Sequence, residues 1–233
     1  MPMLEIRNLR GGWDLTTIVE DFDLRIGDGE TVAVIGRNGV GKTTLLELII
    51  GRARRFSGDI VLAGQSLADL PIHERVRRGL GYVPQQREVF PSLTIREHLA
   101  IAARPGRWTE DAVLALLPGL AARRNSFGGQ LSGGEQQMLA IARALLTNPK
   151  VILMDEPSEG LAPVVLDQLV MALRRLVDDG ALSVLLVEQR VDIALALSTR
   201  CVVMDRGRIA HQCASAEFGA DDAGLAALMG LGA

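Results

Sequence analysis

The sequence predicts an α/β fold with a mostly parallel sheet, to which an N-terminal antiparallel sheet and an inserted helical segment are added. Short apolar runs alternate with helical patterns outside the middle of the chain, which is typical of an α/β core. Residues 3–36 carry extended runs separated by turn signals, and residues 92–147 carry only helical patterns. With 233 residues, of which 48% are hydrophobic, the chain can fill one well-packed domain.

The first part of the chain is predicted to be rich in strands. Its apolar, β-branched runs are short and are separated by turn signals such as Gly27-Asp28-Gly29. The predicted strands here are Leu4–Leu9, Thr17–Ile26, Thr31–Ile35, Asp59–Leu62 and Gly81–Val83.

A glycine-rich loop joins the strand Thr31–Ile35 to a helix predicted at Thr44–Ile50, which ends at Gly51. The loop is Gly36-Arg37-Asn38-Gly39-Val40-Gly41-Lys42-Thr43, and it matches the pattern G-x-x-x-x-G-K-[ST]. An arrangement of strand, glycine loop and helix directs backbone N–H groups and a helix dipole at an anion. We therefore predict that the loop wraps the phosphates of a nucleotide.

The lysine of this loop is a telling residue. Only two of the 25 Lys and Arg residues are Lys, at positions 42 and 150. An ammonium group is a compact point charge that fits between β- and γ-phosphates, whereas a guanidinium is a wide planar fork. We expect Lys42 to neutralise the phosphates and the Thr43 hydroxyl to ligate Mg²⁺.

The helical segment contains two capping boxes. The first, from Thr94 to Glu97, begins a helix that runs to about Ala103. A second helix is predicted at Glu110–Leu117. The third, Ser132–Leu146, begins at Leu131-Ser132-Gly133-Gly134-Glu135, where two glycines are poor choices for a first helical turn. We interpret these glycines as exposing N–H groups at a positive helix end, ready to receive a phosphate.

The last part of the chain alternates strands and helices. The predicted strands are Val151–Met154, Leu182–Val187 and Cys201–Met204; the predicted helices cover 165–177 and Val191–Leu197, and Arg206-Gly207 turns a hairpin into Ile209-Ala210. No internal repeat and no disordered tail are expected.

A carboxylate pair follows the buried strand Val151–Met154. Ligands bind at the carboxyl ends of strands in sheets of this kind, so Asp155 and Glu156 are candidate site residues. Asp155 is expected to hold Mg²⁺ through water. Glu156 is the candidate general base for an attacking water.

Composition excludes several classes of function. The net charge is −3 and no basic tract is present, so a nucleic-acid partner is not expected. Apolar stretches stay under about ten residues, too short to span a bilayer, and the N-terminus lacks the pattern of a signal peptide. Cys201 and Cys213 lack metal-ligand spacing and are interpreted as incidental thiols of a cytosolic chain.

Together these residues resemble an ABC transporter ATPase over nearly the whole chain. Leu131–Glu135 resembles the signature motif, Tyr82-Val83-Pro84-Gln85 the Q-loop, and Val151–Glu156 the Walker B strand. Trp13 occupies the place of an aromatic residue that stacks on adenine. The resemblance implies a P-loop NTPase with a RecA-like core at 1–85 and 148–233 and a helical subdomain at 86–147.

The same resemblance implies the ligands and the roles of individual residues. ATP and Mg²⁺ are the implied cofactors, with Gln85 joining Thr43 and Asp155 at the metal, and Glu156, Gln85 and Gln189 implied in catalysis. The nucleotide-binding set is Trp13, Gly36, Arg37, Asn38, Gly39, Val40, Gly41, Lys42, Thr43 and Thr44, with Ser132, Gly133 and Gly134 acting on the nucleotide of a second subunit.

Finer resemblance points to one subgroup. Residues 82–94 and 156–163 are similar to the smaller ATPase subunit of branched-chain amino acid importers, although urea and short-amide importers share these segments. Two departures are present. Gln189 stands where the family usually has a switch histidine, and Ala162 stands where it usually has an aspartate. These departures leave open a degenerate cassette that binds ATP without efficient hydrolysis.

The implied partners are membrane permease subunits that dock on residues 85–130 and a second ATPase subunit in a head-to-tail dimer. A periplasmic or extracellular solute-binding protein acts indirectly, and the chain is implied to be cytoplasmic, on the inner face of the cell membrane. A DNA-repair or translation ATPase is disfavoured because the chain has one cassette and no long coiled-coil insert. A P-loop kinase or GTPase is also disfavoured. It would need an acceptor-substrate site or a guanine-reading Asn-Lys-x-Asp motif, and Asn148-Pro149-Lys150-Val151 does not fit that motif.

Overall fold

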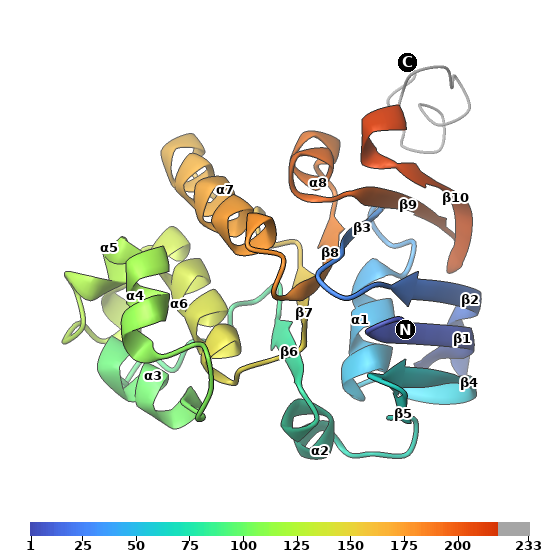
Figure 1. The fold of residues 1–233 in the computed structure, drawn as a ribbon, viewed down its shortest axis with the longest axis horizontal. Helices are drawn as coiled ribbons and strands as arrows, with labels where there is room; N and C mark the ends of the chain where they lie inside the picture. The colour runs from blue at the N-terminus through green and yellow to red at the C-terminus, as the bar shows by residue number, and fades with distance from the viewer. Residues whose placement is uncertain (219–233) are drawn as a thin grey trace.

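The computed structural model describes residues 1–218. The expectation of an ordered C-terminal tail concerns residues outside that range. A mixed sheet lies in the middle of the molecule, with an antiparallel sheet at one end and a group of helices at the other (Figure 1). The predicted α/β fold with an additional antiparallel sheet and an inserted helical segment is confirmed.

The antiparallel sheet has the order β2-β1-β4-β5. Its strands are β1 (Leu4–Trp13), β2 (Thr16–Ile26), β4 (Arg54–Leu62) and β5 (Gln65–Ser66). The strand predicted at Leu4–Leu9 is too short, because Gly11 and Gly12 have the composition of a turn, whereas β1 runs to Trp13. Gly11 instead lies inside the strand, where a Cβ would come within 2.4 Å of Leu48 Cδ2. The glycine therefore lets the following helix pack directly on the sheet.

The central sheet has the order β10-β9-β3-β8-β7-β6. Its strands are β3 (Thr31–Ile35), β6 (Leu80–Val83), β7 (Val151–Asp155), β8 (Ser183–Glu188), β9 (Arg200–Asp205) and β10 (Arg208–Ala214). All of these pair in parallel except β10, which forms a hairpin with β9. Every residue of β3, β7 and β8 is buried, as expected for a parallel sheet covered on both faces.

Helices cover both faces of the central sheet. The helix α1 (Lys42–Ile50) lies between the two sheets, and its leucines and isoleucines join a core built from both. The helices α7 (Pro163–Asp178) and α8 (Val191–Leu197) cover the other face. The predicted helix at 165–177 thus begins two residues earlier, at a proline, which suits a first helical turn.

The helical segment contains α3 (Ile95–Ala102), α4 (Glu110–Leu116), α5 (Pro118–Ala121) and α6 (Gly133–Leu146). Both predicted capping boxes are present, at Thr94 with Glu97 and at Ser132 with Glu135. An isolated bridge joins Thr94 to Phe127, but no strand forms within the segment. The apolar face of α6 packs against α7 and the sheet, which joins the segment to the core.

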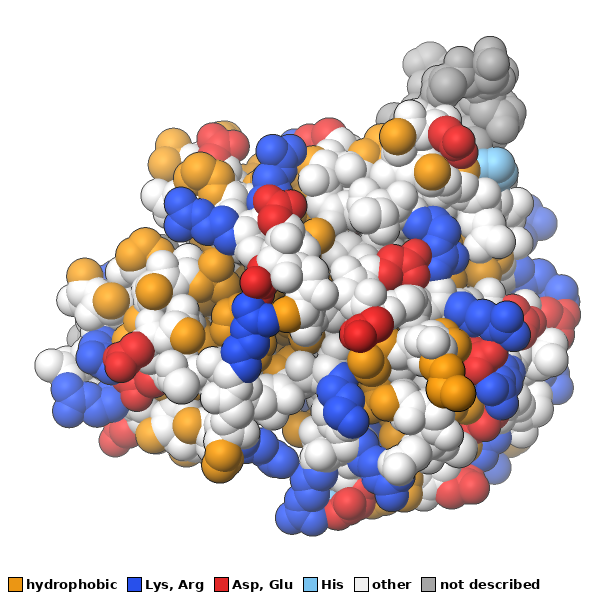
Figure 2. All heavy atoms as spheres, in the orientation of Figure 1, with side chains coloured by type: hydrophobic (Ala, Val, Ile, Leu, Met, Phe, Trp, Pro, Cys, Tyr) orange, Lys and Arg blue, Asp and Glu red, His pale blue; other side chains and the backbone are white. Residues whose placement is uncertain are grey.

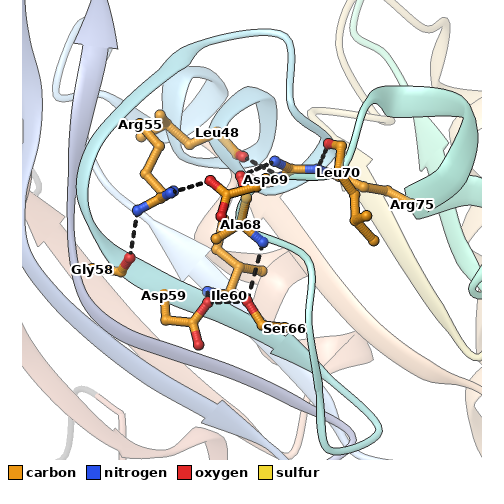
Figure 3. Close-up of polar contacts among 10 residues, drawn as sticks. All are labelled: Leu48, Arg55, Gly58, Asp59, Ile60, Ser66, Ala68, Asp69, Leu70 and Arg75. Atoms are coloured by element: carbon orange, nitrogen blue, oxygen red, sulfur yellow. Dashed lines mark hydrogen bonds and ion pairs between the residues drawn. The ribbon is translucent and has the colours of Figure 1, made fainter.

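The short helix α2 (Ile72–Arg77) was not predicted, and it carries a buried arginine. Arg75 is 4% exposed and donates hydrogen bonds to the carbonyl oxygens of Leu48 and Ile49 at the last turn of α1. It also donates to the carbonyl oxygens of Ala68 and Leu70 (Figure 3). Arg75 therefore supplies donors to helix-end carbonyls that α1 itself cannot satisfy.

We expect Arg75→Met to lower the free energy of unfolding by roughly 2–5 kcal/mol, because it strands buried carbonyl groups without donors. Arg77→Met on the same helix is the control. Arg77 has a side chain that is 61% exposed and, within residues 1–218, pairs only with Glu74, so its loss should cost less than about 1 kcal/mol. Urea denaturation of both variants measures the difference. Equal losses would contradict a specific role for Arg75.

Candidate functional site

The glycine loop leads from the end of β3 into the first turn of α1. Gly41, the residue before the helix, has φ of 107°, a conformation that side chains other than glycine rarely adopt. Gly39 has φ of 81°. A Cβ on Gly36 would lie 2.4 Å from the carbonyl oxygen of Met204. The helix begins at Lys42, two residues before the predicted start.

The lysine of the loop is buried, hydrogen-bonded to the loop and paired with a carboxylate. Lys42 is 4% exposed, and its Nζ donates to the carbonyl oxygens of Gly36 at 2.9 Å and Arg37 at 3.1 Å. Its third contact is an ion pair with Glu156 Oε1 at 3.1 Å. Of the three donors of the ammonium group, two are thus bound by loop carbonyl oxygens, and the Glu156 carboxylate balances the charge. The predicted phosphate-binding lysine and the candidate base are thus direct neighbours.

The two predicted metal residues on β7 and α1 are also in contact. Thr43 Oγ1 donates to Asp155 Oδ1 at 3.1 Å. Asp155 is fully buried, and its second oxygen has no hydrogen-bond partner within the described residues. Burial raises the pKa of Asp155 to about 7, against the lowering effect of the Thr43 hydrogen bond. Leaving a buried acceptor without a donor costs folding free energy. A cation or an ordered water bound to this oxygen would remove that cost.

Glu156 occupies a strained backbone position immediately after β7. Its φ is 43°, in the left-handed region that is unfavourable for residues other than glycine. Its N–H donates to the carbonyl oxygen of Val187 at 2.9 Å, and its side chain is 8% exposed. The strained turn directs the carboxylate toward Lys42 and the loop.

A pocket of about 390 Å³ opens beside the loop. Trp13 is 44% exposed at its edge, as expected for a residue that is not part of the core. Gln85 Nε2 donates to Glu159 Oε2 at 2.6 Å, so its amide is held by a residue that the sequence had not indicated. The lining is Trp13, Ile18, Asn38, Gly39, Gly41, Lys42, Thr43, Thr44, Gln85, Glu156 and Glu159.

The residues 132–134 do not meet the loop within one chain. Ser132 and Gly134 line a different pocket, between α5, α6 and α7. A Cβ on Gly133 would lie 2.9 Å from Arg87 Nη1, and one on Gly134 would lie 2.1 Å from Val165 Cγ1. Close packing on the β-branched Val165 therefore requires Gly134, whereas the flexible end of Arg87 could move away from a side chain at position 133.

The last residue of β8 has a buried side chain, and the residue after it has an exposed one. Gln189 is exposed and does not line the pocket. Glu188, to which we had assigned no role, is 1% exposed and accepts hydrogen bonds from Ser158. A charged residue at the end of the apolar run Leu182–Val187 was a signal that could have identified it.

The surface carries charges of both signs. On the face seen in Figure 2, Lys and Arg side chains alternate with Asp and Glu, and hydrophobic side chains gather over the helical segment. Among residues 1–218, no helix combines the length and the apolar composition that a membrane crossing requires.

The raised pKa of Asp155 predicts a pH dependence of stability. Its pKa rises from an ordinary 3.8 to about 7, so the folded state binds the proton more tightly than the unfolded chain. The stability contributed by this proton is therefore present below about pH 4 and is lost as the pH rises toward 7. The free energy of unfolding of Asp155→Asn should therefore decline less between pH 4 and 7 than that of the wild type. The expected difference is a few kcal/mol, because each unit of pKa shift corresponds to about 1.4 kcal/mol.

The measurement is urea denaturation at several values of pH between 4 and 8, without nucleotide or Mg²⁺, on the wild type and the variant. Identical slopes for the two proteins would show that Asp155 titrates near its ordinary value. Asp28→Asn, at an exposed turn, is the control and should follow the wild type.

Comparisons with known proteins agree with this geometry. The ABC transporter family model matches residues 19–159. The high-affinity branched-chain amino acid transport ATP-binding protein BraG of Pseudomonas aeruginosa is 41% identical over 199 residues, covering 82% of this chain and 84% of BraG. The probable branched-chain amino acid transport ATP-binding protein LivF of Archaeoglobus fulgidus is 39% identical over 213 residues, covering 89% and 90%.

More distant relatives and a solved structure agree with this assignment. The lipopolysaccharide export ATP-binding protein LptB of Escherichia coli is 35% identical, covering 91% of this chain and 90% of LptB. A dimeric ATP-binding cassette in a post-hydrolysis state with ADP and Pi superposes with a TM-score of 0.79 at 26% identity, covering 91% of this chain and 99% of that one. The chain therefore belongs to the ABC transporter family of ATP-binding cassettes, and it is an ATPase homologous to the ATP-binding subunits of branched-chain amino acid transporters.

Proposed function

We propose that this ATPase powers a membrane importer for branched-chain amino acids and that its nucleotide site is the pocket beside the glycine loop. The ion pair between Lys42 and Glu156 carries this proposal, since it joins a phosphate-binding cation to a carboxylate suited to general base catalysis. Trp13 lies at the edge of the same pocket, where an exposed indole can stack on adenine.

The ion pair suggests how binding and hydrolysis are linked. The β- and γ-phosphates of ATP attract Lys42 more strongly than one carboxylate does, because they carry several negative charges. Binding then moves the ammonium group from Glu156 to the phosphates. The freed Glu156 carboxylate accepts a proton from the water that attacks the γ-phosphorus, and the bond to the β-phosphate oxygen breaks to leave ADP and phosphate.

The residues around Asp155 suit a magnesium ion. The Oδ2 of Asp155, which has no hydrogen-bond partner among residues 1–218, and the adjacent Thr43 hydroxyl are hard oxygen ligands, the kind that Mg²⁺ prefers. We propose that both would hold the ion, Asp155 through water, and that Gln85, whose amide nitrogen is bound to Glu159 here, would be a third ligand. The ion would supply charge neutralisation at the phosphate oxygens.

The separation of 132–134 from the loop supports a head-to-tail dimer. Ser132 is exposed at the start of α6, where a helix N-terminus attracts anions, yet it lies outside the pocket of its own chain. We propose that Ser132, Gly133 and Gly134 bind the nucleotide of a second subunit. The solved relative with ADP and Pi is itself dimeric.

A groove on the helical segment suits a membrane partner. It has a volume of about 300 Å³ and lies between α2, β6, α3 and α6. The hydrophobic side chains Ile72, Phe90 and Ile101 along it are 40%, 55% and 72% exposed, which is typical of an interaction surface. We propose that permease subunits dock here, within and beside residues 85–130.

The remaining assignments follow from the relatives. BraG and LivF are named for branched-chain amino acid transport, and we propose the same solute class here. We propose a position on the cytoplasmic face of the membrane, with a solute-binding protein acting on the far side. The division into a core at 1–85 and 148–233 and a helical subdomain at 86–147 is proposed from the same family likeness.

Replacing the base should separate binding from hydrolysis. Glu156→Gln is expected to keep ATP binding and to lower kcat by at least roughly 10²-fold, the scale of a lost general base. Equilibrium binding and steady-state phosphate release measure the two quantities. Asp28→Asn, at an exposed turn, should match the wild type in both. Rapid turnover by Glu156→Gln would remove Glu156 from the base role and refute the proposed mechanism.

A charge at Ser132 should affect only the partner's nucleotide. Ser132→Asp keeps a good N-cap for α6 but places a negative charge where the second subunit's γ-phosphate would lie. We expect unchanged ATP binding by the monomer and loss of most hydrolysis. Asn125→Asp, exposed in the same helical segment, is the matched control. A proportional loss of monomer affinity would contradict the head-to-tail arrangement.

A further inference from the structure

A buried carboxylate at the end of β8 is not used by the mechanism above. Glu188 is 1% exposed, and one carboxylate oxygen accepts the N–H of Ser158 at 3.2 Å. The other oxygen accepts the Ser158 hydroxyl at 2.9 Å. Ser158 is itself 6% exposed. Two segments far apart in the sequence are thus joined by a pair of buried hydrogen bonds to one charged group.

Keeping Glu188 at this position costs free energy. Burial, with a smaller effect of the nearby Glu156 carboxylate, raises its pKa to about 7 in spite of the hydrogen bonds from Ser158 and the Arg190 backbone. An apolar residue in the same place would avoid this cost. The reason for a carboxylate at this position therefore lies in the segment that its two hydrogen bonds with Ser158 hold in place.

Those bonds hold the turn that contains the candidate base. Glu156 is strained, with φ of 43°, and strain of this kind persists only when surrounding contacts enforce it. The Glu156 N–H donates to Val187 O on one side, and Ser158 is bound by Glu188 on the other. The last two residues of β8 therefore hold both ends of the turn 156–158.

We propose that Glu188 is a positioning residue for hydrolysis, which fixes the strained turn 156–158 and so directs the Glu156 carboxylate into the site. This inference rests on the proposed role of Glu156 as the base. It goes beyond that role because Glu188 lies outside the pocket lining and touches neither the loop nor its lysine in the described structure.

The test compares full-length variants at Glu188 with the full-length wild type. Glu188→Leu removes both acceptors and should lower kcat roughly tenfold or more, the worth of one hydrogen bond to a charged group. The dissociation constant for ATP should not change, because the loop is untouched. Glu188→Gln keeps one acceptor and should recover part of the lost kcat. Ser158→Ala removes only the hydroxyl and should give an intermediate kcat.

Ser183→Ala is the matched control, because Ser183 lies at the opposite end of the same strand. Ser183 is fully buried, and its hydroxyl accepts from the Gly29 N–H and donates to the Gly27 carbonyl oxygen. Its loss should lower the melting temperature while kcat stays at the wild-type value. Melting temperature, ATP affinity and kcat are measured for each variant, with kcat taken well below the melting transition.

Each result decides the inference. Wild-type kcat in Glu188→Leu, with Glu156→Gln inactive, would overturn it and leave the proposed function intact. Equal kcat in the Leu and Gln variants, with ATP affinity and melting temperature falling together, would also overturn it by showing a purely structural role. If Glu188→Leu fails to fold, Ser158→Ala decides, and wild-type kcat there overturns the inference. Turnover by Glu156→Gln would overturn both proposals.

Discussion

The buried ion pair between Lys42 and Glu156 is the interaction on which the site depends. An ammonium group that is 4% exposed needs acceptors and a compensating charge; here two carbonyl oxygens accept hydrogen bonds and one carboxylate supplies the charge. Breaking a buried pair by removing one partner leaves an uncompensated charge, which is strongly unfavourable. The glycine loop is therefore folded around its own lysine, and a nucleotide that replaced Glu156, as we propose, would have to bring negative charge of its own.

The parallel sheet brings the two partners together. The loop follows β3, Glu156 follows β7 and Glu188 ends β8, and these strands are neighbours in the order β3-β8-β7. Because parallel strands end at the same edge of a sheet, polar residues placed just after each strand converge there. The middle strand, β8, also holds the turn that follows β7: Val187 O and the Glu188 carboxylate bind residues of the turn 156–158.

The helical segment is linked to this edge through side chains rather than through shared strands. Arg87 donates to the carbonyl oxygen of Glu159 and lies against Gly133, and Gln85 donates to the Glu159 carboxylate. The turn after β7, the segment after β6 and the start of α6 are consequently in contact within one chain. Movement of the helical segment would change these contacts, whereas the buried ion pair at the loop belongs entirely to the core.

The sequence by itself determined the features that depend on local pattern: the buried strands, the glycine loop, both capping boxes and the order of the family motifs. These depend on backbone preferences and on hydrophobic period, which neighbouring residues decide. Tertiary structure alone decided which distant groups meet: Glu156 with Lys42, Glu159 with Gln85, Glu188 with Ser158, Arg75 with the end of α1, and Cys201 opposite Cys213 on β9 and β10. It also carried β1 on through Gly11 and Gly12 to Trp13, because the strand is stabilised by its partners and by the packing of α1, and not by the preferences of its own glycines.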